Sequence, residues 1–189
     1  MTQTAGARVP IFLVGYMCSG KTTLGRALAD KLGCEFVDLD EYIEARQGCS
    51  IADIFARDGE ASFRAIEQKA LDELINNHAT TNAVIALGGG TPCVAGVMAR
   101  LNSVGLTVHL RTDVDRIVER LIEGGAKRPM VAGKDEATLK AMVREMLNKR
   151  EPYYSLAAFD FDSTLLETQA QIDGTVERFI ARFNLNPVK

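Results

Sequence analysis

The stretch IFLVGYMCSGKT, residues 11–22, decides the fold of this chain. Residues 15–22 match the pattern G-x-x-x-x-G-K-[ST] at every fixed position, with an apolar run before them and an amphipathic helical pattern after them. A tightly wrapped loop of this kind presents several backbone N–H groups to a triphosphate, and the following helix adds the positive end of its dipole. The sequence therefore predicts a nucleoside triphosphate site at the end of a strand, rather than a chance glycine turn.

The same loop indicates which residues bind the nucleotide. Lys21 is expected to bridge the β- and γ-phosphates of ATP, and the Thr22 hydroxyl is expected to ligate Mg²⁺. The predicted ATP-binding residues of the loop and of the next helix are Cys18, Ser19, Gly20, Lys21, Thr22 and Thr23. We therefore expect ATP as a co-substrate and Mg²⁺ as a cofactor.

Outward from this loop, short apolar runs alternate with longer helical patterns. The predicted strands cover residues 9–14, 34–37, 83–87, 106–110 and 158–161. Between them, apolar residues recur every three or four positions, as on one face of a helix. Near-continuous apolar strands that alternate with helices are typical of βαβ units around a buried parallel sheet. We predict a three-layer α/β fold with ligands beyond the carboxyl ends of the strands.

Length and composition are those of one soluble globular domain over residues 1–189, with 47% hydrophobic and 25% charged residues. The net charge of −3 gives no reason to expect a nucleic acid or an anionic membrane as a partner. The four cysteines form no zinc-binding pattern, and no apolar run is long enough to span a bilayer. We expect a cytoplasmic protein.

Two segments interrupt the alternation of strands and helices. Residues 48–64 carry mixed charge, and residues 124–135 are rich in glycine and basic residues. Long irregular insertions in a compact domain are usually lids or binding segments. We expect both segments to lie near ligands.

The rest of the chain excludes two other classes of nucleotide-binding protein. A switch GTPase requires an N-K-x-D sequence, whereas residues 148–151 read NKRE. A large ATPase would have an aspartate at the end of the third strand, which here runs into the glycines at 88–90. Three successive glycines allow the backbone to approach a ligand closely, although a bare turn is the alternative. These features favour a small metabolite kinase.

Two acids follow the second predicted strand, Asp38 and Asp40. Residues two apart in a strand face the same side, so both carboxylates are predicted to point into the cleft beside the phosphate loop. One can hold a metal-bound water or take a hydroxyl proton, and the other can accept hydrogen bonds from hydroxyls of the acceptor. The alternative is that Asp40 caps the helix that begins after it.

From residue 11 to about residue 183 the chain resembles the shikimate kinase family. The resemblance rests on motifs in the family's order and at about its spacing: the loop at 15–22, Asp38-x-Asp40, Phe63-Arg64, Gly88-Gly89-Gly90, Arg128-Pro129, and Arg150 with Tyr153 and Tyr154. It implies a nucleoside-monophosphate-kinase-like fold, with a five-stranded parallel sheet and a mobile lid. It also implies ATP-dependent phosphorylation of the shikimate 3-hydroxyl, in the biosynthesis of chorismate and aromatic amino acids.

The resemblance implies roles for individual residues. The shikimate-binding residues would be Asp40, Arg64, Gly89 and Arg150, in part within a segment of about residues 38–66. The catalytic residues would be Lys21, Asp38 and Arg128, with Arg128 on a lid of about residues 124–137 that closes on the phosphates of ATP. Arg120 would approach the adenine. We expect a monomer that binds shikimate and ATP.

The chemistry of these side chains agrees with a hydroxylated carboxylate as the acceptor. Arg64 and Arg150 can clamp a carboxylate through charge-assisted hydrogen bonds, and Glu67 is spaced to orient Arg64. For either arginine alone, an ordinary surface ion pair would be the better interpretation. One position departs from the family, which usually has glycine where this chain has Cys18. A positive φ there would cost a non-glycine residue about 1 kcal/mol or more.

Two other functions stay open at this point. The first is a related kinase that acts on gluconate or on a nucleoside monophosphate. A nucleotide acceptor would need a base-stacking pocket, yet aromatic residues make up only 6% of the chain and tryptophan is absent. The second is a non-catalytic ATP-binding module, which would bind ATP without acceptor-dependent release of ADP.

Overall fold

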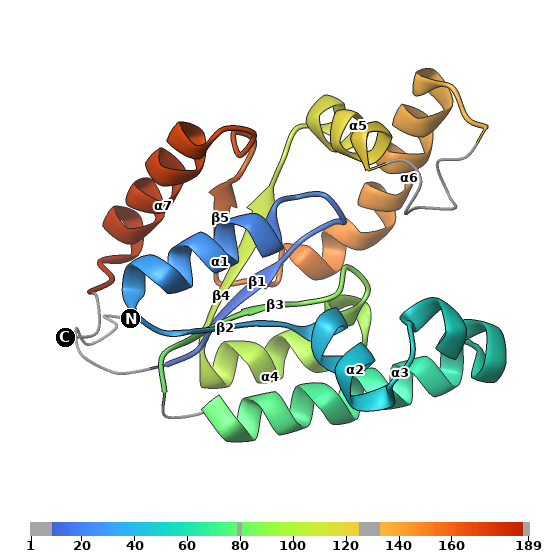
Figure 1. Cartoon of the computed structure of the whole chain (residues 1–189), viewed down its shortest axis with the longest axis horizontal. Coiled ribbons are helices and arrows are strands. Elements are labelled where there is room, and N and C mark those ends of the chain that lie inside the picture. Colours follow the sequence, from blue (N-terminus) through green and yellow to red (C-terminus); the bar gives the residue numbers. More distant parts are fainter. Residues whose placement is uncertain (1–8, 79–80, 125–132, 187–189) are drawn as a thin grey trace.

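Five parallel strands form one sheet at the centre of the molecule (Figure 1). The computed structural model describes residues 9–78, 81–124 and 133–186. The strands are β1 (Ile11–Val14), β2 (Glu35–Asp38), β3 (Ala83–Ala86), β4 (Leu106–Arg111) and β5 (Phe159–Asp162). Their order across the sheet is β2-β3-β1-β4-β5, and every neighbouring pair is parallel. The predicted three-layer α/β fold with a five-stranded parallel sheet is confirmed.

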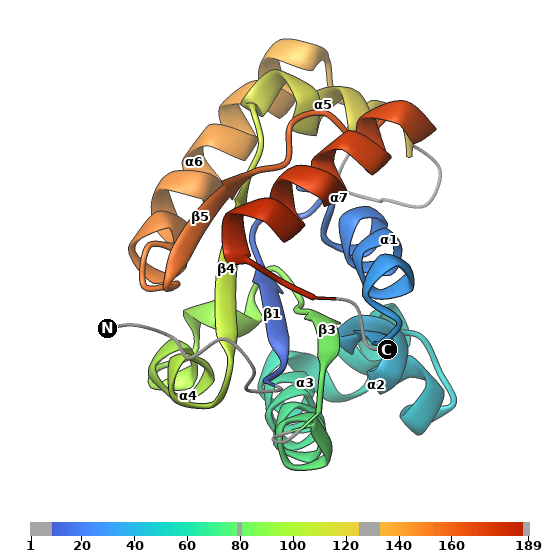
Figure 2. The same ribbon diagram turned by 90° about the vertical axis from the view of Figure 1, so that its left-hand side faces the viewer.

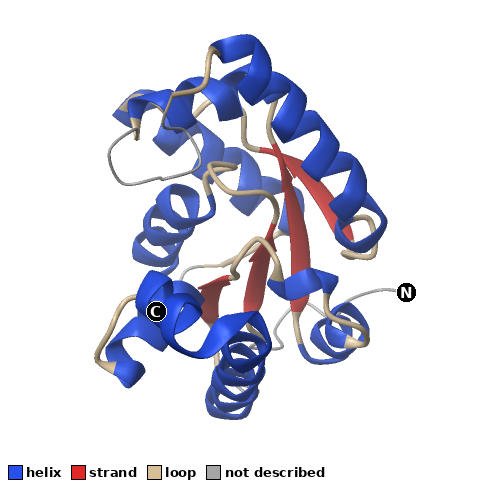
Figure 3. Cartoon of the chain, turned by 90° about the vertical axis from the view of Figure 1, so that its right-hand side faces the viewer, coloured by secondary structure: helices blue, strands red, loops and turns tan. Residues whose placement is uncertain are grey.

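Helices cover both faces of the sheet (Figures 2 and 3). The described helices are α1 (Lys21–Leu32), α2 (Leu39–Gln47), α3 (Ile51–His78), α4 (Val97–Val104), α5 (Val114–Glu123), α6 (Glu136–Tyr154) and α7 (Gln169–Phe183), with a short 3₁₀ helix η1 (Thr91–Cys93). In the described part of the chain, no helix combines the length and apolar character needed to cross a membrane.

Side chains of β1 alternate between two apolar cores. Phe12 and Val14 pack into a core shared with α2, α3 and α4 on one face of the sheet. Ile11 and Leu13 pack into a second core with α1 and α7 on the opposite face. Because both faces are covered, the strand consists of four consecutive buried apolar residues. A third core joins Tyr16 to α5 and α6, beyond the carboxyl ends of the strands.

Residues 51–64 differ from the prediction, because they are helical rather than irregular. They form the first part of α3, which contains a kink at Gly59 with φ 78° and ψ 175°. Ser50 and Asp53 exchange hydrogen bonds at the start of this helix and so cap it. The buried Ile54 and Phe63 anchor the two parts of the helix on either side of the kink. Most charged residues of this segment lie on the solvent-exposed face of the helix.

The topology brings three motifs together. The phosphate loop follows β1, the glycines at 88–90 follow β3, and Asp38 is the last residue of β2. These strands are neighbours in the order β2-β3-β1, and Ala86 of β3 is in register with both Asp38 and Leu13. Since parallel strands end at the same edge of the sheet, the three motifs lie side by side there.

Candidate active site

Lys21 lies at the start of α1 and reaches back over the phosphate loop. Its Nζ donates hydrogen bonds to the carbonyl oxygens of Gly15 at 2.9 Å and Tyr16 at 2.8 Å. Burial lowers the pKa of Lys21 to about 8, although the nearby carboxylates of Asp40 and Asp38 act in the opposite direction. The ammonium group is therefore partly desolvated, and it interacts strongly with any anion that reaches the loop.

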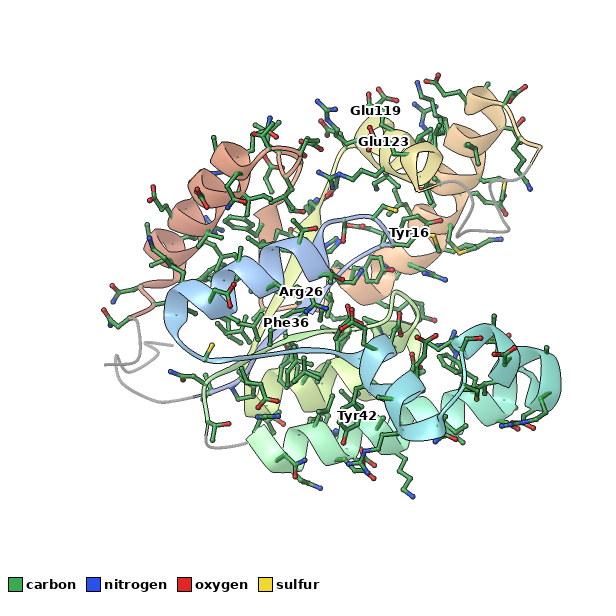
Figure 4. The ribbon with its side chains drawn as sticks, in the orientation of Figure 1. Tyr16, Arg26, Phe36, Tyr42, Glu119 and Glu123 are labelled. Carbon is green, nitrogen blue, oxygen red and sulfur yellow. The ribbon has the colours of Figure 1, made fainter. Side chains whose placement is uncertain are left out.

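The loop opens into a cavity of about 530 Å³. Five predicted nucleotide-binding residues line it, together with residues from α5 and from the connection between β5 and α7: Cys18, Gly20, Lys21, Thr22, Thr23, Arg120, Glu123, Leu166 and Glu167. Figure 4 shows Glu123 on α5, and Tyr16 in the loop on the side of α6. Ser19 is different, because its side chain is buried behind the loop and lines a separate cavity of about 860 Å³.

Arg120 joins the phosphate loop to the connection between β5 and α7. Its Nη1 donates to the carbonyl of Cys18 at 2.9 Å, and its Nη2 donates to the carbonyl of Thr164 at 2.7 Å. The same guanidinium pairs with Glu167 at 2.8 Å. Arg120 also lines the cavity at the phosphate loop, and its approach to the adenine stays a prediction. Leu166 and Glu167 were not predicted, because they belong to no recognisable sequence motif. The one feature that could have indicated them is the connection after β5, which begins at the same edge of the sheet as the phosphate loop.

Cys18 has a left-handed backbone conformation, with φ 61°. From the sequence alone, only the cost of a positive φ at this position could be stated, and the structure shows that the positive φ is present. A left-handed conformation costs a non-glycine residue about 1–2 kcal/mol, which the surrounding loop must offset. Arg120 contributes by holding the carbonyl of Cys18.

Asp38 contacts both the phosphate loop and α2. Its Oδ2 accepts a hydrogen bond from the Thr22 hydroxyl at 2.8 Å, and its Oδ1 accepts one from the backbone N–H of Asp40 at 3.1 Å. Asp38 is therefore the N-cap of α2. The strand-based argument for the two acids was wrong, because the helix begins at Leu39 and Asp40 lies in its first turn. The capping alternative was also misplaced, since it named Asp40.

Asp40 nevertheless lies close enough to Asp38 and Lys21 for both charges to act on it. The pKa of Asp40 is raised to about 6, chiefly by burial and also by the charges of Asp38 and Glu67, while Lys21 acts in the opposite direction. One carboxylate oxygen lies close to Gly88, where an added Cβ would be 2.9 Å from it. This carboxylate is held in an unfavourable ionised state near the loop, as is typical of groups that serve a function.

Arg64 is oriented by a buried acid. Its Nη1 donates to Oε2 of Glu67 at 2.8 Å, and Oε1 of Glu67 accepts from the Thr91 hydroxyl at 2.7 Å. Glu67 is only 1% exposed, so Arg64 and Thr91 supply hydrogen bonds that water would otherwise provide to its carboxylate. The prediction that Glu67 orients Arg64 is confirmed. The guanidinium packs against Gly90, where an added Cβ would lie 2.7 Å from Nη2.

Each glycine of the turn after β3 faces a different predicted acceptor-binding side chain. Gly88 lies against Asp40, Gly90 lies against Arg64, and Gly89 lies against Arg150, whose Nη1 would be 3.1 Å from an added Cβ. The Arg150 guanidinium also lies 5.6 Å from the centre of the Tyr16 ring. The structure thus brings Asp40, Arg64, Gly89 and Arg150 together around one turn. Arg128 lies outside the described residues, so its role stays a prediction.

A phosphate loop at the end of β1, next to a cluster of arginines and carboxylates on neighbouring elements, defines a small P-loop kinase of the nucleoside-monophosphate-kinase-like fold. A model of the shikimate kinase family matches residues 17–181. The chain belongs to the shikimate kinase family, which consists of ATP-dependent phosphotransferases.

Similar proteins of known sequence or structure agree with this assignment. A shikimate kinase of Azobacteroides pseudotrichonymphae is 44% identical over 151 residues, covering 80% of this chain and 88% of the relative. The crystal structure of shikimate kinase from Bacteroides thetaiotaomicron has a TM-score of 0.87 and 40% identity, covering 94% of this chain and 99% of that one. Shikimate kinase from Acinetobacter baumannii, solved in complex with shikimate, has a TM-score of 0.78 and 32% identity and covers 94% of each chain.

Proposed function

We propose that this chain transfers the γ-phosphate of ATP to the 3-hydroxyl of shikimate, giving shikimate 3-phosphate and ADP. The observation that carries this proposal is the turn at residues 88–90, where Asp40, Arg64 and Arg150 converge beside the phosphate loop. Shikimate has one carboxylate and three hydroxyls. Arg64 and Arg150 would clamp the carboxylate, and Asp40 would accept hydrogen bonds from the ring hydroxyls.

The nucleotide would occupy the cavity at the phosphate loop. Its phosphates would contact the loop backbone from Cys18 to Thr23 and the Nζ of Lys21, and its base would lie beside Arg120 and Leu166. Positioned cations stabilise the charge that spreads over the transferring phosphoryl group. Lys21 is one such cation, and we propose Arg128 as a second.

Thr22 and Asp38 are the residues that would hold Mg²⁺. A hydroxyl and a carboxylate, 2.8 Å apart, are the oxygen donors that this ion prefers, and its remaining ligands are usually waters and substrate phosphates. Within the described ranges, no group of three or more His, Cys, Asp or Glu side chains could hold a metal alone. When bound, Mg²⁺ supplies positive charge to the phosphates. In the proposed reaction Asp38 would also hold a water or take the proton of the reacting hydroxyl.

The direct test is ADP release with ATP and Mg²⁺, comparing shikimate, gluconate, nucleoside monophosphates and no acceptor. Release with shikimate alone is the expected result. Release with gluconate or a nucleotide would keep the kinase activity and overturn the acceptor. ATP binding without any acceptor-dependent release would favour the non-catalytic module. A monomer in the cytoplasm stays part of the proposal, and light scattering after size-exclusion chromatography tests the monomeric state.

Replacing Arg64 with lysine is expected to raise the KM for shikimate roughly 10- to 100-fold. Lysine keeps the charge but cannot bridge Glu67 and a substrate carboxylate at once, so a charged hydrogen bond of about 1.5–3 kcal/mol is lost. Steady-state kinetics with shikimate varied at saturating ATP measures the change. Arg57→Lys is the matched control, because Arg57 is an exposed arginine on the same helix that pairs with Asp58. Equal KM values for the Arg64 variant and the wild type would remove Arg64 from the acceptor site.

Replacing Arg128 with alanine is expected to lower kcat by roughly tenfold or more, with a smaller effect on the KM for shikimate. The reason is that a lid arginine would act mainly on charge that develops during phosphoryl transfer. Lys134→Ala is the control, since Lys134 is an exposed cation of the same lid segment. A change in KM without a change in kcat would move Arg128 out of the catalytic role.

A further inference from the structure

Tyr154 ends helix α6, one helical turn after Arg150. Its side chain is completely buried, and its ring lies 5.0 Å from the ring of His109, centre to centre. Its hydroxyl donates a hydrogen bond to the carbonyl oxygen of Gly89 at 2.7 Å. Tyr154 therefore connects the helix that carries Arg150 to the glycine turn of the acceptor site.

The glycine turn depends on such contacts for a single conformation. Glycine has wide backbone freedom, so three glycines in a row do not fix their own geometry. The carbonyls of Gly88 and Gly90 accept hydrogen bonds from the backbone N–H groups of Thr91 and Cys93 within the turn. The carbonyl of Gly89 is held instead by the side chain of Tyr154. The central peptide of the turn is thus fixed from another element of the fold.

Gly89 lies between the predicted acceptor-binding arginine and the phosphate loop, with its closest side-chain contact on Arg150. An added Cβ at Gly89 would lie 3.1 Å from Nη1 of Arg150, and 3.6 Å from the carbonyl of Gly15 and the backbone nitrogen of Met17. Gly89 is thus packed between the predicted carboxylate-binding arginine and the phosphate loop. A small rotation of its peptide would change the distance between the turn and the Arg150 guanidinium.

The hydroxyl of Tyr154 remains a hydrogen-bond donor over a wide range of pH. Burial raises the pKa of Tyr154 to about 12, although the neighbouring Arg150 acts in the opposite direction. The phenol therefore keeps its proton over the whole pH range in which the enzyme can be assayed. The hydrogen bond to Gly89 is correspondingly independent of pH in that range.

We propose that Tyr154 is a positioning residue for the acceptor carboxylate, acting through its hydrogen bond to Gly89 and its place one turn after Arg150. It touches neither substrate; it holds the turn and the arginine in one relative position, so that both meet the carboxylate together. This inference rests on the proposed function, because it assigns a role within the same acceptor site.

Tyr154→Phe tests the proposal, because phenylalanine keeps the buried ring and removes only the hydroxyl. We expect the KM for shikimate to rise about tenfold, as for the loss of one buried hydrogen bond, with less than a twofold change in the KM for ATP. We also expect the preference for shikimate over shikimate methyl ester, measured as the ratio of kcat/KM values, to shrink by a similar factor. Tyr153→Phe, which alters the neighbouring and half-exposed tyrosine, should change none of these values.

The outcomes separate a positioning role from a structural one. Loss of folded enzyme would lower the apparent kcat with every substrate and leave the KM values unchanged, and a thermal melt of each variant detects it. An unchanged KM for shikimate in Tyr154→Phe, or an equal loss with the acid and the ester, would overturn the role of Tyr154. Wild-type enzyme that releases no ADP with shikimate would instead overturn the proposed function, and this role with it.

Discussion

Replacing Lys21 with methionine is expected to reduce shikimate-dependent ADP release about 1,000-fold. Methionine has nearly the same length as lysine but carries no charge, so the transferring phosphoryl group loses a positioned cation in a partly desolvated site. The fold should survive, because two hydrogen bonds to the loop carbonyls are lost while the cost of burying the ammonium group is removed.

A coupled assay for ADP, run with saturating shikimate, measures this loss, and a thermal melt checks the fold. Lys31→Met is the matched control, because Lys31 is the exposed lysine in the last turn of the same helix. The control should retain full activity. A folded Lys21→Met variant that still phosphorylates shikimate at more than a tenth of the wild-type rate would contradict the assignment of the phosphate loop.

Replacing Asp40 with asparagine is expected to reduce kcat/KM for shikimate at least about 100-fold and, at the same time, to stabilise the protein. The loss of activity follows because an asparagine accepts hydrogen bonds from hydroxyls less strongly than a carboxylate, and each charged hydrogen bond contributes about 1.5–3 kcal/mol. The gain in stability follows from the pKa of Asp40, which burial raises to about 6 from its usual value near 4.

The pH dependence of this stabilisation has a definite sign. Between about pH 4 and pH 6 the folded state holds a proton on Asp40 that the unfolded state has released. The contribution of Asp40 to the free energy of unfolding therefore falls as the pH rises through this range, and it stays low above pH 6. The penalty is at most about 3 kcal/mol, from about 1.4 kcal/mol for each unit of pKa. Asp40→Asn removes the penalty.

Thermal melts of the wild type and of Asp40→Asn, from pH 4 to pH 8, measure the effect. The variant should melt several degrees higher at neutral pH, and the difference should vanish toward pH 4. The wild-type KM for shikimate should also rise below pH 6, where Asp40 loses its charge. Asp30→Asn provides the comparison with an exposed acid of α1. A lower melting temperature for Asp40→Asn at neutral pH would show that its carboxylate stabilises the fold instead.

The strands were the most predictable part of this fold. Each expected range agrees with the observed strand to within two residues at either end. For β1 and β3 the reason is that a parallel strand buried on both faces is apolar throughout, whereas the edge strands β2 and β5 also contain exposed acidic residues. The first part of α3 was not predictable in the same way. Its charged residues and the glycine at 59 hide the helical spacing of the two residues that are buried, Ile54 and Phe63.

The candidate site was predictable where a motif carries it, and not where the chain changes its secondary structure. The spacing of Arg64 and Glu67 gave their contact correctly, because both lie on one helix. The prediction of how Asp38 and Asp40 are oriented was wrong, because it treated them as parts of one strand. The chain passes from strand to helix at Leu39. Contacts between distant segments, such as that of Tyr154 with Gly89, depend on the whole fold and leave no local pattern.

The order β2-β3-β1 has a consequence for how this enzyme can diverge in evolution. The phosphate loop follows β1 and the glycine turn follows β3. These strands are adjacent, and backbone hydrogen bonds fix their separation at about 4.8 Å. The approximate spacing between the ATP site and the acceptor site is therefore set by the sheet, and side chains such as Tyr154 adjust only the local geometry of the glycine turn. Mutations on α2, α3 and α6 can therefore change which acceptor the enzyme phosphorylates, while ATP and the acceptor stay aligned for phosphoryl transfer.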